Sequence, residues 1–331
     1  MFEEELGIGQ KAVLEAMLSS RTFQKEQKEL VVEDHINKKD NSPVTAADFL
    51  VQAIVCKILT DRFPHIPIVG EERSDALKKP EHKEILDKII HYIEYDGKIS
   101  EILNRENLLQ NIDLGVGEST SQTFWTLDPI DGTKGFLRGE QFAIALALIV
   151  EGEVKLGILG CPNLTLPDQQ SSQGYLFFAV KNQGTQLLNV ESGETQKVNC
   201  SSISDPKMMR FVESYESSHS NLDLQLQIAR TLEMEQDPVR LDSQVKYGIV
   251  ATGNAEIYLR IPNPKTPDYR EKIWDHAAGS LVVEEAGGVV TDISGKKLDF
   301  SAGKTLKNNS GVFASVPTIH SRILGIIKEL T

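Results

Sequence analysis

Two aspartates, Asp128 and Asp131, directly follow an apolar run, and this arrangement constrains the fold more than any other part of the sequence. Residues 124–127 predict a short buried strand. Because Pro129 has no N–H to donate to a sheet, we expect the chain to leave the sheet where the two acids sit. The next residues predict a helix start, capped by the side chain of Asp131 or Thr133, whose free backbone amides can receive an anion.

The two carboxylates indicate one of two arrangements. Hard divalent cations prefer oxygen ligands, and Mg2+ held by a few carboxylates keeps open positions for phosphate. Acids at a strand end beside a helix start therefore favour a metal-assisted phosphoryl site. The alternative is an Asx turn with a solvated second acid, because short motifs also occur without function.

The charge balance limits the ligands of the chain. Its 331 residues are 40% hydrophobic, which is enough for two packed lobes with a sizeable core. Lys and Arg number 35 against 48 Asp and Glu, a net charge of −13, which argues against a nucleic-acid or anionic-membrane surface. A phosphate-rich ligand would then need positive charge from elsewhere, and bound metal ions are the obvious source.

The sequence also bears on compartment and redox chemistry. No stretch approaches the roughly 20 consecutive apolar residues of a membrane span, and the acidic N-terminus is unlike a secretory signal, so we expect a cytoplasmic protein. The cysteines Cys56, Cys161 and Cys200 are scattered without CxxC spacing. This disfavours a disulfide framework and a zinc site.

Helical spacing of apolar residues predicts two helices in the first part of the chain, over residues 5–30 and from about 46 to 63. We expect both on the outside of the protein. Thr45 is placed to cap the second helix, with Asp48 as its third residue. Taken alone, Asp48 is explained by its favourable interaction with the helix dipole.

A strand expected over residues 63–69 ends at Gly70, so Glu71 follows a strand as Asp128 and Asp131 do. Acids in such positions are usually solvated. The carboxyl ends of strands are also where open sheets gather their ligands.

The rest of the chain predicts two kinds of organisation. Residues 74–118 show helical charge patterning and predict a surface insertion or flap. Apolar strands joined by tight turns then predict an antiparallel sheet, with strands over 141–150, 153–160, 174–180 and 185–190. From about residue 207, strands alternate with helices, which is typical of an α/β lobe. Those strands are expected over 209–212, 238–241, 257–260, 288–291 and 312–315, and those helices over 222–234, 244–253, 274–286 and 318–330.

Trp274, Asp275 and His276 open one of these expected helices. By default Asp275 complements the helix dipole, and His276 packs or hydrogen-bonds rather than binding a metal. A functional role is favoured because four carboxylates share the same kind of position, at the ends of elements that open a cleft. They are Glu71, Asp128, Asp131 and Asp275.

Three sequence blocks together resemble the lithium-sensitive phosphatases related to inositol monophosphatase. They are Gly70-Glu71-Glu72, Asp128-Pro-Ile-Asp-Gly-Thr133 and the segment from Trp274-Asp275-His276-Ala-Ala-Gly279 to Glu285-Ala-Gly-Gly288. Further blocks are most similar to the 3'(2'),5'-bisphosphate nucleotidases. They are Asn41-Ser-Pro-Val-Thr-Ala-Ala-Asp48, Thr133-Lys-Gly-Phe-Leu-Arg-Gly-Glu-Gln141, Ser217-Ser-His219, Leu241-Asp-Ser-Gln-Val-Lys246-Tyr and Tyr258-Leu-Arg260. The blocks span about residues 38–316, and nothing of functional weight aligns within 74–118.

The resemblance implies an α/β (α+β) fold, a layered αβαβα sandwich with an antiparallel first sheet and a mixed second sheet. We expect an N-terminal α+β domain over 1–205 that carries most metal ligands. The C-terminal α/β domain over 206–331 would carry Asp275 and the nucleotide contacts.

The resemblance also implies an enzyme that uses Mg2+ to remove the 3'-phosphate of adenosine 3',5'-bisphosphate (PAP), releasing AMP. Two or three Mg2+ ions would bind to Glu71, Asp128, Asp131, Asp275 and the carbonyl of Ile130, and Li+ would inhibit. Inhibition by Na+ or Ca2+ is left open. So is cleavage of 3'-phosphoadenosine 5'-phosphosulfate (PAPS) or inositol 1,4-bisphosphate.

The remaining implied roles concern the attacking water and the substrate. Asp48 and Thr133 would act as a catalytic pair that orients the water. The amides of Gly132 and Thr133 would receive phosphate oxygens. The implied nucleotide contacts, in which the cations hold the 5'-phosphate, are His219, Ser243, Lys246 and Arg260, with Asp275 also close to the substrate.

Other functions stay open on the sequence. The nearest enzymatic rival is an inositol or sugar-phosphate phosphatase, which would have no use for a distal grip by Lys246 and Arg260. A catalytically inactive nucleotide sensor would not need Asp48, Thr133 or the full set of carboxylates. We expect a monomer with a small-molecule nucleotide substrate and neither a nucleic-acid nor a membrane partner.

Overall fold

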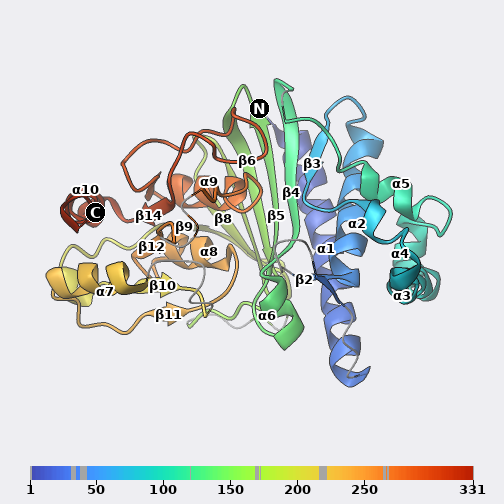
Figure 1. Ribbon diagram of the computed structural model, residues 1–331, viewed down its shortest axis with the longest axis horizontal. Helices are drawn as coiled ribbons and strands as arrows, with labels where there is room; N and C mark the ends of the chain where they lie inside the picture. Colours follow the sequence, from blue (N-terminus) through green and yellow to red (C-terminus); the bar gives the residue numbers. More distant parts are fainter. Residues whose placement is uncertain are drawn as a thin grey trace.

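The computed structural model describes residues 2–30, 35–37, 43–119, 121–167, 171, 173–215, 222–263, 266 and 268–330. Its layers follow the order helix, sheet, helix, sheet, helix, as the sequence predicted (Figure 1). The helices that cover one face of the first sheet are α1 (Glu3–Leu30) and α2 (Ala46–Arg62). The middle layer holds α8 (Val245–Ala251) and α9 (Ala277–Glu285), and the opposite outer layer holds α7 (Leu222–Thr231) and α10 (Pro317–Leu330).

In the described part of the chain, seven strands form the first sheet in sequence order. They are β3 (Ile68–Gly70), β4 (Thr123–Asp131), β5 (Ala143–Val150), β6 (Glu153–Cys161), β7 (Tyr175–Val180), β8 (Thr185–Asn189) and β9 (Thr195–Val198). The sheet is antiparallel except at its edge, where β3 runs parallel to β4. This parallel pair brings two carboxyl ends to the same edge.

The second sheet is mixed, as expected. Its strands lie in the order β11 (Val239–Arg240), β10 (Phe211–Glu213), β12 (Ile257–Arg260), β14 (Val312–Ser315) and β13 (Val289–Thr291). The strand β10 is parallel to both its neighbours, whereas β14 is antiparallel to both of its own. The strands β1 (His35–Asn37) and β2 (Pro43–Thr45) pair antiparallel as a separate two-stranded sheet. The domain boundary near residue 205 stays a prediction.

The expectation that the chain leaves the sheet at Pro129 is wrong. The strand β4 continues to Asp131, and its pairing with β5 shifts register between Asp128 and Asp131. A bulge leaves a residue without a partner in the ladder, so proline, which lacks an N–H, is tolerated there. The bulge also gives the two aspartates their placement at the end of the strand.

The helix α2 begins as predicted, but its expected place on the outside is wrong. Thr45 is the N-cap, and its backbone N–H donates to Asp48 Oδ2 at 2.7 Å. Every residue from Ala46 to Cys56 is buried. A helix that is apolar on all sides has to be covered on all sides.

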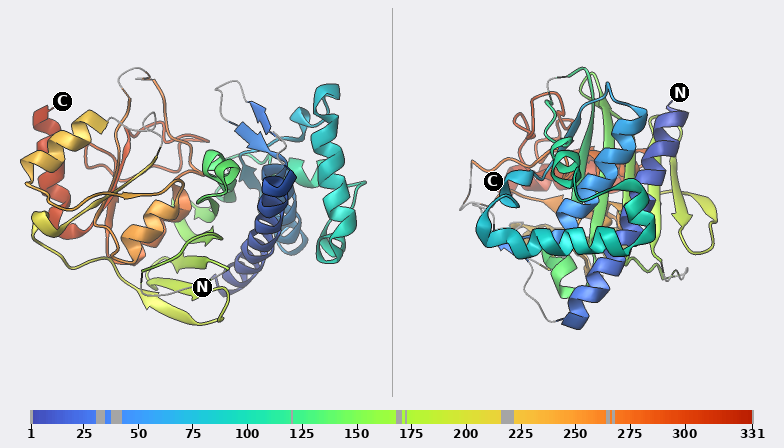
Figure 2. Two further views of the ribbon diagram at one scale, coloured as in Figure 1. Left: turned by 90° about the horizontal axis from the view of Figure 1, so that it is seen from below. Right: turned by 90° about the vertical axis from the view of Figure 1, so that its right-hand side faces the viewer.

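Residues 74–118 supply that cover. We expected a surface insertion or a flap, and the flap is wrong because the segment is packed against α2. The helices α3 (Lys83–Tyr95), α4 (Gly97–Ile102) and α5 (Leu108–Asp113) each contact α2. Figure 2 shows them lying across the side of α2 that faces away from the sheet. Their buried contacts include Ile89, Ile93, Ile99 and Ile112.

The middle helix α9 contacts both sheets, and it packs at very short range against the first sheet and against α8. It contacts β5 to β8 on one side and β13 and β14 on the other. At Gly157 on β6, a Cβ atom would lie 2.8 Å from the carbonyl oxygen of Ala278. At Gly279 on α9, a Cβ atom would lie 2.2 Å from the ring of Tyr247 on α8. These contacts leave no room for a side chain.

None of the helices in the described residues combines the length and hydropathy that crossing a bilayer requires.

Candidate active site

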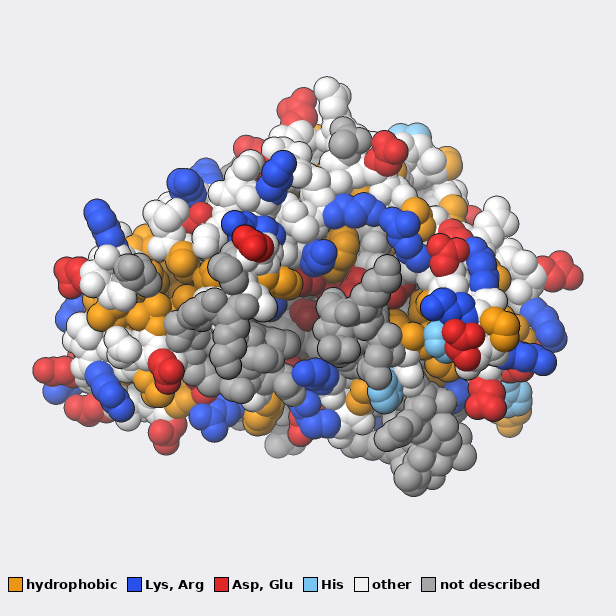
Figure 3. Space-filling model, in the orientation of Figure 1, with side chains coloured by type: hydrophobic (Ala, Val, Ile, Leu, Met, Phe, Trp, Pro, Cys, Tyr) orange, Lys and Arg blue, Asp and Glu red, His pale blue; other side chains and the backbone are white. Residues whose placement is uncertain are grey.

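A cavity of about 230 Å3 lies where the first sheet meets residues of the second half of the chain. Glu71, Asp128 and Asp131 line it from the first sheet. Lys246 and Arg260 line it from α8 and β12. Figure 3 shows acidic side chains at the bottom of a hollow, with Lys and Arg side chains around it.

The carboxylates reach this cavity from three elements. Glu71 directly follows β3, and its backbone N–H donates to the carbonyl of Leu127 on β4 at 3.2 Å. Asp128 and Asp131 lie on β4 at its bulge. Asp275 stands two residues before α9 and lines the same cavity. The structure thus brings together all four acids singled out in the sequence.

The negative charges of these acids lie so close together that the surrounding protein groups compensate them only in part. Asp128 is 2% exposed, and its Oδ1 is buried without a hydrogen-bond partner. Burial, followed by the charges of Glu71, Asp131 and Asp275, raises the pKa of Asp128 well above its usual range. Burial and the charge of Asp131 do the same to the pKa of Asp275. A cluster of carboxylates in which the buried Asp128 has an unpaired oxygen fits an oxygen-ligated cation such as Mg2+.

Asp131 differs because a backbone N–H and two cations face it. Its Oδ2 accepts a hydrogen bond from the backbone N–H of Gln244 at 2.6 Å. Burial raises the pKa of Asp131, while Lys246, the Gln244 amide and Arg260 oppose this rise. Asp131 is therefore the acid that lies between the acidic and the basic parts of the cavity.

The helix α6 (Thr133–Arg138) starts where the sequence predicted, but the predicted side-chain cap is wrong. The N-cap is Gly132, in the left-handed region with φ of 87°. A Cβ atom there would lie 2.9 Å from Cβ of Ser243, so glycine is required on both grounds. Gly132 and Thr133 line the cavity.

Asp48 and Thr133 each have a defined place. Asp48 Oδ2 accepts from the backbone N–H and the hydroxyl of Thr45, at 2.7 Å and 2.6 Å. The charge of Asp48 also helps to raise the pKa of Asp128, although burial and nearer acids contribute more. Thr133 Oγ1 donates to the carbonyl of Ile130 at 3.1 Å. The pairing of Asp48 with Thr133 stays a prediction.

Three predicted residues line the basic part of the cavity, namely Ser243, Lys246 and Arg260. Ser243 has a left-handed φ of 67° in the turn before α8. Lys246 Nζ lies 5.4 Å from the ring centroid of Tyr258. Burial and the nearby Arg260 lower the pKa of Lys246 to about 8, against the opposing charges of Asp131 and Asp242. The fourth predicted contact, His219, lies outside the described residues.

Comparison with known proteins identifies the family. A model of the inositol monophosphatase family matches residues 3–331. The chain belongs to the inositol monophosphatase family. It is 42% identical to the 3'(2'),5'-bisphosphate nucleotidase of Oryza sativa, covering 99% of this chain and 96% of that protein. It is also 42% identical to the nucleotidase of that name from Schizosaccharomyces pombe, covering 95% and 92% of the two chains. The resemblance found in the sequence is thereby confirmed.

Solved structures of the inositol monophosphatase family share the fold. The suhB protein of Bartonella henselae superimposes with a TM-score of 0.69 at 19% identity, covering 99% of both chains. An inositol monophosphatase of Thermotoga maritima gives a TM-score of 0.67 at 20% identity, covering 99% of this chain and 98% of that one. Membership of a monophosphatase family confirms the expected enzyme class, a phosphatase.

Sequence reasoning missed one buried acid of this family member, Glu271. Its side chain is 8% exposed and pairs with Arg260 Nε at 2.8 Å. Burial alone would raise the pKa of Glu271, but Arg260 and His276 lower it to about 2. The only local signal was the charged run over 270–272, which is typical of a solvated turn.

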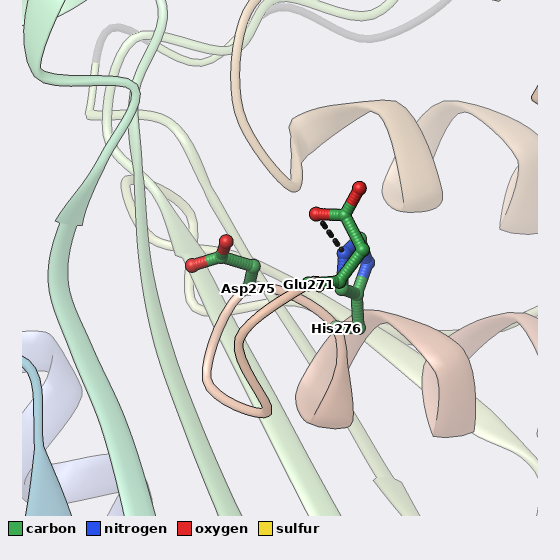
Figure 4. Close-up of side chains that lie close together, drawn as sticks. All are labelled: Glu271, Asp275 and His276. Carbon is green, nitrogen blue, oxygen red and sulfur yellow. Dashed lines mark hydrogen bonds and ion pairs between the residues drawn. The ribbon is translucent and has the colours of Figure 1, made fainter. Parts of the chain in front are cut away.

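Glu271, Asp275 and His276 also place one potential ligand atom each within 4.8 Å of one another. Glu271 and His276 are already paired with each other, and the carboxylate of Asp275 points away from them (Figure 4). His276 therefore hydrogen-bonds, as expected, and we do not count this group as a second metal site.

Proposed function

We propose that this chain removes the 3'-phosphate of adenosine 3',5'-bisphosphate, giving AMP and inorganic phosphate. One observation carries the proposal, namely that a cluster of crowded carboxylates and the cations Lys246 and Arg260 line the same small cavity. The carboxylates suit a metal and the phosphate to be cleaved, and Lys246 and Arg260 suit a second phosphate that is kept. The relatives at 42% identity, which are named bisphosphate nucleotidases, support this assignment.

The metal would be Mg2+, as two or three ions held by Glu71, Asp128, Asp131, Asp275 and the carbonyl of Ile130. Bound magnesium supplies positive charge to the phosphate oxygens and lowers the pKa of a bound water. A donor set of carboxylates and a carbonyl, without thiol or imidazole, favours Mg2+ over Zn2+.

Asp48 and Thr133 would orient the attacking water. The Thr133 hydroxyl donates to the carboxylate of Asp48 and accepts a hydrogen bond from the water, which aligns the water with the ester bond. This role requires the hydroxyl to turn from the carbonyl of Ile130, its acceptor in the structure. No covalent intermediate on the enzyme is needed.

The remaining groups would hold the substrate. The amides of Gly132 and Thr133 receive oxygens of the 3'-phosphate, and Asp275 lies close to the same group. Lys246 and Arg260 bind the 5'-phosphate, whose negative charge matches their own positive charge. Ser243 and His219 complete the nucleotide contacts.

We further propose that the enzyme works in the cytoplasm as a monomer on small nucleotides, without a nucleic-acid or membrane partner. The net charge of −13 supports the last point, because it repels polyanions.

A phosphate-release panel tests the proposed function. The substrates are PAP, 3'-AMP, PAPS, inositol 1-phosphate and inositol 1,4-bisphosphate, each measured with Mg2+ and with EDTA. We expect the highest kcat/KM for PAP and no turnover in EDTA. A higher kcat/KM for inositol 1-phosphate would assign the chain to the inositol phosphatases. Full activity in EDTA without added metal would overturn the metal-assisted mechanism. Asp131→Asn, which lacks a proposed ligand, controls for contaminating phosphatase.

A further inference from the structure

Arg260 enters the cavity at one end of a line of hydrogen-bonded side chains. Its Nε donates to Glu271 Oε1 at 2.8 Å. The other oxygen of Glu271 lies 3.2 Å from His276 Nε2, and His276 Nδ1 lies 2.7 Å from the hydroxyl of Tyr247. Glu271 is 7% exposed, and His276 and Tyr247 are fully buried.

The chemistry of these groups fixes which atom donates in each hydrogen bond of this line. A carboxylate only accepts hydrogen bonds, so the Nε2 of His276 must carry the proton it shares with Glu271. Burial favours the neutral imidazole, which then has an unprotonated Nδ1. The hydroxyl of Tyr247 therefore donates to His276, His276 donates to Glu271, and Arg260 donates to the same carboxylate from the other side.

We propose that Glu271, backed by His276 and Tyr247, is a positioning residue that holds Arg260 ready for the distal phosphate and so sets the preference for bisphosphates. This inference rests on the proposed function. A guanidinium is planar, so fixing its Nε fixes the plane in which the remaining N–H groups point. Arg260 lines the cavity with its side chain 20% exposed, and its guanidinium also interacts with the hydroxyls of Tyr258 and Tyr269, so a ligand reaches the exposed part of the guanidinium.

Preorganisation explains why a buried line of this kind is useful. A free arginine side chain loses rotamer entropy when it is immobilised, so a ligand that has to order it binds correspondingly more weakly. The Glu271 carboxylate orders Arg260 before the ligand arrives. Figure 4 shows Glu271 and His276 facing each other, with Asp275 turned away toward the first sheet.

The first test measures binding without turnover. AMP carries the 5'-phosphate and adenosine carries none, so their affinities are compared by calorimetry in metal-free buffer. Glu271→Gln keeps the shape but removes the charge, and should weaken AMP about tenfold or more while adenosine is unchanged. Glu256→Gln is the matched control, because Glu256 is also buried at 2% exposure and accepts from the backbone N–H of Arg210.

The second test uses kinetics. Glu271→Gln should raise KM for PAP about tenfold with kcat nearly unchanged, and should leave 3'-AMP unaffected. Tyr247→Phe keeps its ring in the core but loses the hydroxyl, and should raise KM for PAP about two- to fivefold. If melting curves show that Glu271→Gln does not fold, KM of Tyr247→Phe for PAP is the quantity that tests the inference.

A double-variant cycle separates positioning from a general structural effect. Once Arg260→Ala has removed the guanidinium, Glu271→Gln should change KM for PAP by less than about twofold. Equal losses on AMP and adenosine, or full additivity in the cycle, would overturn the inference. A raised Mg2+ requirement with unchanged KM would instead make Glu271 a metal ligand. Wild-type protein that binds AMP no better than adenosine would overturn the proposed distal phosphate site itself.

Discussion

The backbone N–H of Gln244 donates to Asp131 Oδ2 at 2.6 Å, and the Gln244 side chain bonds the segment that carries Asp275. Its Nε2 donates to the carbonyl of Trp274 at 2.8 Å, and its Oε1 accepts from the N–H of Gly279 at 3.1 Å. One residue thus sets the position of an acid from the first sheet relative to an acid beside α9. The proposed metal ligands are placed by contacts between distant segments as well as by their own elements.

Removing one acid should separate stability from activity. Since the folded protein raises the pKa of Asp128 above its unfolded value, its ionised form destabilises the metal-free fold at neutral pH. We therefore expect Asp128→Asn to melt at the wild-type temperature or above it without metal, to lose the stabilisation that Mg2+ gives wild type, and to lose turnover. Melting curves with and without Mg2+ measure the first two effects, and phosphate release measures turnover.

The control for that variant is Asp292→Asn. Asp292 is 1% exposed, and hydrogen bonds from Ser294, Lys296 and Asn309 outweigh its burial and lower its pKa. Its charge stabilises the fold at neutral pH, so this variant should melt lower than wild type. An equal fall in both variants would contradict the crowding of charge at Asp128.

Substitution of Lys246 tests the distal phosphate site. Lys246→Met keeps most of the side-chain volume but removes the charge. We expect KM for PAP to rise by the equivalent of roughly 1.5–3 kcal/mol, the value of one charge-assisted contact, with little change for 3'-AMP. Equal losses on both substrates in steady-state assays would show that Lys246 does not contact the second phosphate.

The proposed pair of Asp48 and Thr133 should behave as one unit. Asp48→Asn and Thr133→Ala should each lower kcat by about 10²–10⁴-fold. The kcat of the double variant should be close to that of the less active single variant. Nucleotide affinity, measured by calorimetry with Ca2+ in place of Mg2+, should stay near wild type. A double loss equal to the product of the single losses would mean that the two residues act independently.

Lithium should inhibit at millimolar-scale concentrations. Li+ is a small hard cation that can occupy a weak magnesium position but carries too little charge to activate water. Rates of phosphate release should fall with LiCl and recover with added Mg2+. KCl at the same ionic strength should have little effect, and rates that LiCl leaves unchanged would argue against the proposed metal site.

Acid should destabilise the protein through His320. Burial lowers the pKa of His320 from 6.5 to about 4, so between these values the unfolded chain binds a proton that the folded protein does not. Stability is present above pH 6.5 and is lost as pH falls toward 4, by roughly 3 kcal/mol in total. Urea unfolding at pH 7.5, 5.5 and 4.5 measures the loss.

The neutral His320 ring is fixed by its neighbours. It stacks on Phe313 with centroids 4.2 Å apart, and its nitrogens lie 2.8 Å from Ser315 Oγ and 3.0 Å from Thr291 Oγ1. His320→Gln cannot titrate, so its stability should fall less over this pH range than that of wild type. Parallel curves for the two proteins would rule out the assignment.

The carboxylates were predictable because their signal is local. Asp128 and Glu71 each follow an apolar run, and strands that end in acids predict a shared edge when they pair in parallel. The burial of α2 was also visible in the sequence, since residues 46–56 are mostly apolar on all sides. Its place was predicted wrongly because residues 74–118 were not recognised as the helices that cover it.

Glu271 could not have been predicted in the same way. Its neighbours Arg270 and Lys272 give it the local pattern of an exposed turn. It is buried only because Arg260 from β12 and His276 at the start of α9 bring compensating partners to it. An ion pair between distant elements leaves no periodic signal in a single sequence.

The tight packing of α9 also bears on how the proposed substrate would be recognised. Asp128 stands on the first sheet and Arg260 on the second, with α9 wedged between the two sheets. Gly157 lets the first sheet approach α9 as closely as the backbone allows, and Gly279 lets α9 approach α8 within the middle layer. Under the proposed function, the thickness of the middle layer would set the separation between the cleaved phosphate and the retained one. A methyl group added at Gly157, which does not line the cavity, would push α9 away from the first sheet and increase this separation.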